Sequence, residues 1–136
     1  PFWDALLSPY SELVDFVLKP NCNIFCAYKN NEILATIFLV WSKESVYVSR
    51  FGVAFAYRGL GVPKRILVWL KIVCQSRNIS LIEFDTFDHM SRLHLFYERL
   101  GFNKVNSYRQ KGTLVRFSRF QKKILPRSQP DDQDVI

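Results

Sequence analysis

The chain is poor in the residues that metal centres and disulfide frameworks need. It contains three cysteines and two histidines among 136 residues, and these are too few and too scattered to complete a structural zinc site. Cys22, Cys26 and Cys74 are odd in number and fall in strand-like and helix-like patterns. They fit small buried thiols better than a disulfide set. We therefore expect no metal site and a reducing, cytoplasmic setting.

Long apolar runs and acidic side chains are also scarce. Even the most hydrophobic stretch, from Ile33 to Trp41, is soon interrupted by Lys43, so no segment is long enough to cross a bilayer. Lysine and arginine number 19 against 12 aspartate and glutamate residues, which gives a formal net charge of +7. A basic balance favours an anionic partner, such as a phosphorylated cofactor, an acidic substrate or a nucleic acid. A solvated basic surface explains most of these residues equally well.

Hydrophobic and aromatic side chains, in contrast, are abundant. They make up 49% and 15% of the residues, which is enough for one core at this length. We expect a single domain over residues 1–125. Residues 126–136 are polar and rich in aspartate, so we expect a disordered tail there.

Hydrophobic periodicity predicts the order of the helices and strands. Ser8 and Pro9 fit the N-cap and first position of a helix that closes at Pro20. Gly52 indicates a bulge or a close backbone approach in its strand. Gly101 is placed as the C-terminal stop of the last helix, and His94 on that helix is expected at the surface. Predicted strands cover residues 22–28, 33–41, 45–53, 80–87, 103–109 and 113–120, and predicted helices cover residues 63–77 and the apolar stripe at Leu93, Phe96, Tyr97 and Leu100.

This order predicts an α/β (α+β) fold with a mixed central sheet. Most neighbouring strands are joined by short turns and are therefore expected to be antiparallel. The third and fourth strands are joined by a helix, so they should be parallel, as in a βαβ unit.

The most informative segment is Tyr57-Arg58-Gly59-Leu60-Gly61-Val62-Pro63, between a predicted strand and a predicted helix. Glycines let the backbone approach a ligand closely, and the first N–H groups of a helix point at it with the helix dipole behind them. Such a turn predicts a phosphate or pyrophosphate site. Short Gly-x-Gly turns also occur for purely structural reasons.

Together with a second segment, this turn makes the chain resemble the GNAT acetyltransferase superfamily. Residues 53–62 resemble its strand and pyrophosphate-loop signature, Arg/Gln-x-x-Gly-x-Gly/Ala, and residues 93–102 resemble its Phe-Tyr-x-x-x-Gly-Phe element. The likeness covers roughly residues 22–120. The resemblance implies a GNAT-like fold that is curtailed at its N-terminus. A curtailed start exposes a sheet edge near residues 22–28, which a homodimer could cover.

The resemblance also implies an activity and a cofactor site. The implied activity moves an acetyl group from acetyl-coenzyme A, as co-substrate, to a primary amine by direct attack. Tyr97 is implied as the general acid for the leaving thiolate, although it also fits an ordinary core aromatic position. The implied cofactor-binding residues are Phe51, Val53, Arg58, Gly59, Leu60, Gly61, Val62, Lys64 and Arg65.

The resemblance implies that a carboxylate or a water chain takes the proton of the amine. Glu83 and Asp85 alternate with apolar residues on one predicted strand, so their side chains share a face. Asp85 is nearer the carboxyl end of that strand, where ligands of parallel strands tend to bind. We therefore place it ahead of Glu83, Asp88 and His89. Carboxylates on one face also fit a solvated surface.

Two departures from the family pattern leave other functions open. Pro63 stands where the signature usually has glycine or alanine, and it lacks an N–H group. Met90 stands where the second element often has asparagine. One alternative is a catalytically degenerate domain that binds acyl-coenzyme A or a protein partner. Another is an acetyltransferase that acts on aminoacyl-tRNA through its basic surface.

The acceptor is expected to be an amine on a small molecule or a peptide. Arginines on the last strands, Arg109, Arg116 and Arg119, suggest an acidic acceptor. A nucleic-acid-binding module is a further alternative, which we do not favour because the basic residues are dispersed and no RNA-binding signature accompanies them.

Overall fold

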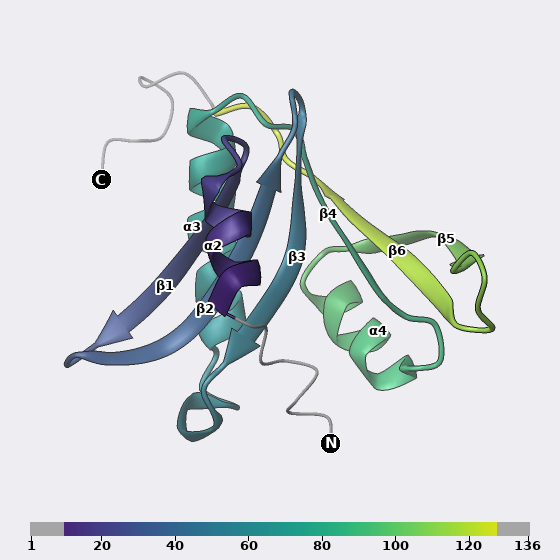
Figure 1. The fold of residues 1–136 in the computed structure, drawn as a ribbon, viewed down its shortest axis with the longest axis horizontal. Helices are drawn as coiled ribbons and strands as arrows, with labels where there is room; N and C mark the ends of the chain where they lie inside the picture. The colour runs from purple at the N-terminus through teal and green to yellow at the C-terminus, as the bar shows by residue number, and fades with distance from the viewer. Residues whose placement is uncertain (1–9, 128–136) are drawn as a thin grey trace.

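The helices and strands follow one another in the predicted order (Figure 1). The structure, a computed structural model, describes residues 10–127. The elements are α2 (Tyr10–Leu18), β1 (Cys22–Lys29), β2 (Glu32–Trp41), β3 (Ser45–Val53), the short 3-10 helix η1 (Phe55–Tyr57), α3 (Val62–Ser76), β4 (Leu81–Phe87), α4 (Ser91–Arg99), β5 (Asn103–Arg109) and β6 (Arg116–Lys123).

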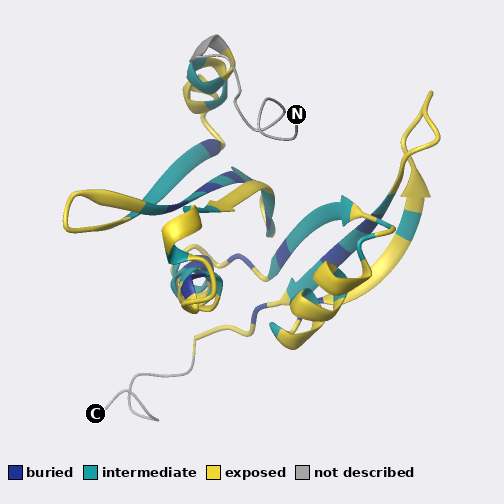
Figure 2. Cartoon of the chain, turned by 90° about the horizontal axis from the view of Figure 1, so that it is seen from below, coloured by how far each residue is buried: buried dark blue, intermediate teal, exposed yellow. Residues whose placement is uncertain are grey.

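The strands form one mixed sheet in the order β1-β2-β3-β4-β6-β5. Strands β3 and β4 are parallel, and every other neighbouring pair is antiparallel, which confirms the predicted mixed sheet. Helices α3 and α4 lie on one face of the sheet, and α2 lies on the other face over β1 and β2 (Figure 2). Within residues 10–127, no helix is both long and apolar enough to span a membrane.

The core lies between the sheet and α3. Leu39 of β2 and Val46 of β3 are completely buried, and they belong to one cluster with Leu70 and Cys74 of α3. On the opposite face, the Phe16 ring of α2 lies 5.3 Å from the Phe38 ring. The apolar stripe of α3 therefore fixes the helix that follows the glycine-rich turn.

Strands β3 and β4 pair over a short distance and then diverge. Their register covers only Ser45–Tyr47 of β3, and its last pair joins Tyr47 to Glu83. Just beyond it, Ser49 bulges out of the β2–β3 ladder, because Leu39 pairs with Val48 and Phe38 with Arg50. A bulge bends its strand and increases the twist, which favours the divergence.

The predicted position of this irregularity was wrong. Gly52 pairs regularly with Thr36, and a Cβ atom at Gly52 would meet Thr36 Oγ1 at 3.8 Å, an ordinary contact. The bulge lies at Ser49 instead.

The end of α4 agrees with the prediction at Gly101. Gly101 has φ 93°, and its N–H donates to the Glu98 carbonyl at 3.0 Å while the N–H of Phe102 donates to the Tyr97 carbonyl at 3.0 Å. This is a Schellman motif, which requires a left-handed residue after the helix.

Two sequence expectations need correction. Strand β6 runs from Arg116 to Lys123 rather than over residues 113–120, because Thr113 and Val115 close the turn: Val115 N–H donates to Thr113 Oγ1 at 3.1 Å. His94 is half-buried rather than a surface residue, since its ring lies 5.0 Å from the Phe120 ring and Nε2 lies 3.0 Å from the Phe87 carbonyl oxygen. The predicted N-cap at Ser8 and most of the predicted tail fall outside the described residues.

Candidate active site

The glycine-rich turn forms the entrance to α3. Gly59 has φ 77° and Gly61 has φ 79°, a left-handed conformation that side chains rarely adopt. The first helical bond runs from Arg65 N–H to the Gly61 carbonyl at 3.2 Å. The N–H groups of Val62 and Lys64 precede that bond and therefore have no acceptor within the helix, whereas Pro63 has no N–H to offer. The turn can thus present amide donors to an anion.

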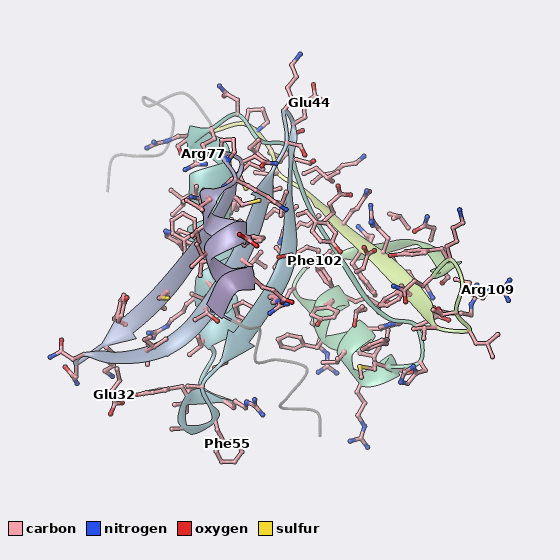
Figure 3. All side chains as sticks on the ribbon, in the orientation of Figure 1. Glu32, Glu44, Phe55, Arg77, Phe102 and Arg109 are labelled. Carbon is pink, nitrogen blue, oxygen red and sulfur yellow. The ribbon has the colours of Figure 1, made fainter. Side chains whose placement is uncertain are left out.

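Contacts with neighbouring segments hold this turn in place. The Arg58 side chain donates through Nε to the Val53 carbonyl at 3.3 Å. The Tyr57 hydroxyl donates to Glu32 Oε2 in the β1–β2 hairpin. Glu32 and Phe55 lie at the same end of the molecule, where β3 leads into the turn (Figure 3).

A pocket of about 190 Å³ lies where β3 and β4 diverge. It is lined by side chains from both strands and from both α3 and α4, including Val48, Phe51, Pro63, Leu67, Asp85 and Tyr97. It therefore runs from the first turn of α3 to the catalytic tyrosine predicted on α4. Phe51, Asp85 and Tyr97 are brought together here, whereas Glu83 is not among the lining residues.

The edge of β3 on this pocket has polar backbone groups to offer. Its pairing with β4 ends at Tyr47, so the N–H and C=O groups that point toward β4 beyond that residue lack a strand partner. Unpaired backbone groups need another donor or acceptor. An extended amide-containing ligand in the gap would supply one.

Tyr97 lies among aromatic rings at the pocket wall. Its ring centroid is 4.5 Å from that of Phe84 and 5.5 Å from that of Phe120. Burial raises the pKa of the Tyr97 phenol, and a hydrogen bond with Thr86 opposes part of this shift. The phenol is therefore protonated at neutral pH and can act as a proton donor.

Asp85 is held by an arginine and a tyrosine on the face of the sheet opposite α3 and α4. Arg119 donates to both of its oxygens, from Nε to Oδ1 and from Nη2 to Oδ2, each at 2.8 Å. The Tyr47 hydroxyl donates to Oδ2 at 2.7 Å. Burial raises the pKa of Asp85, but the hydrogen bonds from Arg119 and Tyr47 outweigh burial, so that the pKa lies below its usual value.

Glu83 shares that face with Asp85 but is less tightly held. Its Oε1 accepts a hydrogen bond from Gln121 Nε2 at 2.9 Å and lies 3.7 Å from Arg119 Nη1. The shared face that alternation predicted for the two carboxylates is thus present, with Arg119 contacting both.

Asp88 and His89, the lower-ranked candidates for the base, lie after β4. Asp88 Oδ1 accepts hydrogen bonds from Ser118 Oγ at 2.5 Å, Ser107 Oγ at 2.9 Å and Lys104 Nζ at 3.3 Å. These bonds hold the pKa of Asp88 well below its usual value. Asp88 therefore clamps the β4–α4 connection to β5 and β6. His89 is exposed, 5.8 Å from the Phe87 ring.

Sequence reasoning missed Tyr47 and the role of Arg119 as a partner of Asp85. Tyr47 lies 38 positions from Asp85, and Arg119 lies 34 positions from it. Only the strand register, which pairs Asp85 with Arg119, brings them together. Between residues 10 and 127, no cluster of three or more His, Cys, Asp or Glu side chains could hold a metal ion.

Three features occur together in this structure: the glycine turn before α3, the diverging parallel strands β3 and β4, and the tyrosine at the pocket wall. A family model described as an acetyltransferase (GNAT) domain matches residues 20–104. The chain belongs to the GNAT acetyltransferase family.

Known proteins similar to this GNAT chain agree with the family and its fold. The Bacillus subtilis (strain 168) protein YesJ, an uncharacterized N-acetyltransferase, is 26% identical over 94 residues, which cover 59% of this chain and 52% of YesJ. The chain thus spans about half the length of this relative.

Two crystal structures share the GNAT fold. The ribosomal-protein-S18-alanine N-acetyltransferase from Escherichia coli superposes with a TM-score of 0.71 at 16% identity, covering 90% of this chain and 81% of that one. An aminoglycoside 6'-N-acetyltransferase complexed with coenzyme A gives 0.74 at 18% identity, covering 94% and 87%.

Proposed function

We propose that this protein is an N-acetyltransferase that moves an acetyl group from acetyl-coenzyme A to a primary amine. The observation that carries the proposal is the pocket between the diverging strands, which connects the first turn of α3 with Tyr97. Family membership supports the activity, and the coenzyme A complex of a structural neighbour supports the cofactor.

The residues around the glycine turn fit the cofactor. The backbone of Gly59, Leu60, Gly61 and Val62 would face the pyrophosphate, with N–H groups at the positive end of α3. Arg58 and the exposed cations of the first helical turn, Lys64 and Arg65, add positive charge. The unpaired edge of β3, including Phe51 and Val53, would run beside the pantetheine arm. Acetyl-coenzyme A supplies the activated thioester.

The proposed reaction needs one acid and one base. The amine nitrogen attacks the thioester carbonyl carbon, so that a C–N bond forms and the C–S bond breaks. Tyr97, which its raised pKa keeps protonated at neutral pH, gives its proton to the departing sulfur. The surplus proton of the amine goes to a carboxylate on β4.

We assign different roles to Asp85 and Glu83. The lowered pKa of Asp85 makes it a weak base, so we infer that it stays ionised at the pocket and orients the amine. Glu83 lacks the bidentate arginine contact of Asp85. Because Glu83 does not line the pocket, we infer that it takes the proton through water, which reverses the order that strand position alone suggested.

Calorimetric titration with acetyl-coenzyme A and with coenzyme A tests the proposal. We expect a Kd of about 1–100 μM for the native chain. Gly61→Trp should abolish binding, because a large side chain would enter the anion site. Gly112→Trp is the matched control: Gly112 has φ 80°, against 79° for Gly61, and a Cβ atom has open space at both positions.

Each outcome of this titration has a clear meaning. Loss of binding in Gly61→Trp but not in Gly112→Trp assigns the turn to the cofactor. Absence of binding to the native chain at millimolar cofactor would refute the acetyltransferase function and favour a domain that binds a protein partner.

A further inference from the structure

Three aromatic rings lie in a row across β4, β6 and β5. The Phe87 and Phe117 ring centroids are 5.2 Å apart, and those of Phe117 and Tyr108 are 5.8 Å apart, with an angle of 25° between the planes in each pair. The strand register places Phe117 opposite both of its neighbours. Phe87 and Tyr108 remain 39% and 37% exposed. We call these residues the aromatic row.

The aromatic row faces away from α3 and α4. The Phe84 ring packs against Tyr97 of α4, so alternation along β4 turns Asp85 and Phe87 to the opposite face. On that face α2 lies over β1 and β2, and no helix in the described part of the chain covers β4, β6 and β5 (Figure 2). The row is therefore accessible to a ligand.

The aromatic row is continuous with the candidate active site. Asp85 is two positions before Phe87 on the same face of β4, and it also lines the pocket. The Tyr108 phenol lies beside Asp85 and Arg119. Burial, and after it Asp85, raises the pKa of Tyr108, whereas Arg119 lowers it. A ligand that touches the row thus reaches the mouth of the pocket.

Two carboxylates lie beside the aromatic row. Glu83 and Asp85 are both contacted by Arg119. A second cation, Arg50, lines the pocket with Asp85 and lies 5.6 Å from the Phe38 ring centroid. Because Asp85 and Glu83 already engage Arg119, this arginine is a poor anchor for the acidic acceptor that the sequence suggested.

We propose that the acceptor is a primary amine attached by a short linker to an aromatic ring. The ring lies against the aromatic row, and the amine lies beside Asp85 and Glu83. Residues two apart on a strand are about 6.5 Å apart, a span that suits a ring carrying a two-carbon amine. Exposed aromatic side chains favour offset or edge-to-face contacts with such a ring. This inference rests on the proposed acetyltransferase function and names its substrate class.

The test compares matched amines as acceptors. Release of the coenzyme A thiol is measured with 2-phenylethylamine, with 2-cyclohexylethylamine, which has similar bulk and no aromatic ring, with n-butylamine and with an aspartate-initiated peptide. We expect kcat/KM for 2-phenylethylamine to exceed that for 2-cyclohexylethylamine about two- to tenfold, and to exceed those for n-butylamine and the aspartate-initiated peptide as well. Equal values for the aromatic and cyclohexyl amines, or a preference for the acidic peptide, would overturn the proposal.

Variants connect this preference with the aromatic row. Tyr108→Leu and Phe117→Leu should abolish the preference while leaving the KM for acetyl-coenzyme A unchanged. Tyr108→Phe keeps the ring and should keep the preference, as should Tyr28→Leu, a control on the exposed β1–β2 hairpin. A preference that survives both Tyr108→Leu and Phe117→Leu would contradict the assignment even if one variant folds poorly.

The same experiments separate the two proposals. If coenzyme A binds and other amines are acetylated while 2-phenylethylamine is not, the substrate class is wrong and the acetyltransferase function stands. If coenzyme A does not bind and no amine is acetylated, the proposed function fails, and the substrate class fails with it.

Discussion

At the scale of single residues, the environment of Tyr97 bears most directly on the chemistry. Its phenol is kept protonated by burial. Tyr97→Phe removes the proton donor and keeps the ring, so kcat should fall about 100-fold while the Kd for coenzyme A, measured by calorimetry, stays the same. Tyr28→Phe, at an exposed position, is the control and should leave both unchanged. An unaltered kcat in Tyr97→Phe would make this tyrosine a packing residue only.

Asp85 provides a second prediction at the residue scale, concerning stability and pH. Because its pKa in the folded state is lowered, its contribution to stability is present above the ordinary carboxyl pKa and is lost as the pH falls below it. Asp85→Asn should lower the free energy of unfolding by about 1–3 kcal/mol at pH 7, since Arg119 loses its partner. Urea unfolding should find a smaller difference at pH 3. An equal difference at both pH values would contradict the ionic origin of the effect.

Single residues also show what the sequence can and cannot reveal. The glycine turn at Gly59 and Gly61 was predictable because such a turn depends on residues that are close together in the sequence. The Tyr47–Asp85–Arg119 cluster was not predictable, because its members come from three strands and the local sequence does not specify the register of those strands. The likeness of Phe96-Tyr97 to a family element identified Tyr97, whereas nothing comparable marks Tyr47.

At the scale of elements, α3 depends on its buried stripe. Leu70 is 2% exposed and belongs to the core cluster, whereas Ile72 on the same helix is 58% exposed. Leu70→Ala should lower the free energy of unfolding by about 2–5 kcal/mol, and Ile72→Ala should change it by less than about 0.5 kcal/mol. Urea denaturation of the two variants checks this. Similar losses in both would mean that the cluster does not anchor α3.

The elements were easier to predict than their packing. Alternation and turn residues identified all six described strands, and β6 was displaced only because Thr113 and Val115, typical strand residues, close a turn. The apolar stripe of α4 was less informative. Tyr97 and Leu100 pack against the core cluster, but Leu93 and Phe96 are both 39% exposed. Only half of the predicted stripe therefore packs against the core cluster, and Phe96 lines the pocket instead.

At the scale of the whole molecule, folding raises the pKa values of several acids on different elements. Burial raises the pKa of Cys74 to about 11, and burial also raises the pKa values of Tyr47, Tyr97 and Tyr108. Groups whose pKa is raised by folding stabilise the protein below their unfolded pKa, and this stability is lost as the pH rises through the folded value.

We therefore expect the free energy of unfolding to decline steadily from pH 9 to pH 11. Urea titrations at intermediate pH values measure the slope. Tyr47→Phe removes one of these acids and should decline less steeply. A flat profile, or an identical slope in the variant, would show that these groups do not couple to folding.

The overall topology was predictable, but the opening in the sheet was not. A helix between the third and fourth strands requires a parallel pair, and nothing in the local pattern of β3 or β4 limits that pair to three positions. The limit comes from sheet twist and from the bulge at Ser49, which develop only when all the strands are assembled. The pocket, and with it the aromatic row, depends on that assembly.

The short β3–β4 register also has a mechanical consequence. The other neighbouring strands are joined over six or more register pairs, whereas this seam has three, from Ser45↔Leu81 to Tyr47↔Glu83. A load pulling β1 away from β5 would therefore concentrate at the seam between β3 and β4. The sheet would separate there first, because this seam has the fewest register pairs. In a single-molecule stretching experiment, a ligand bridging the diverging strands would raise the force at which this seam yields.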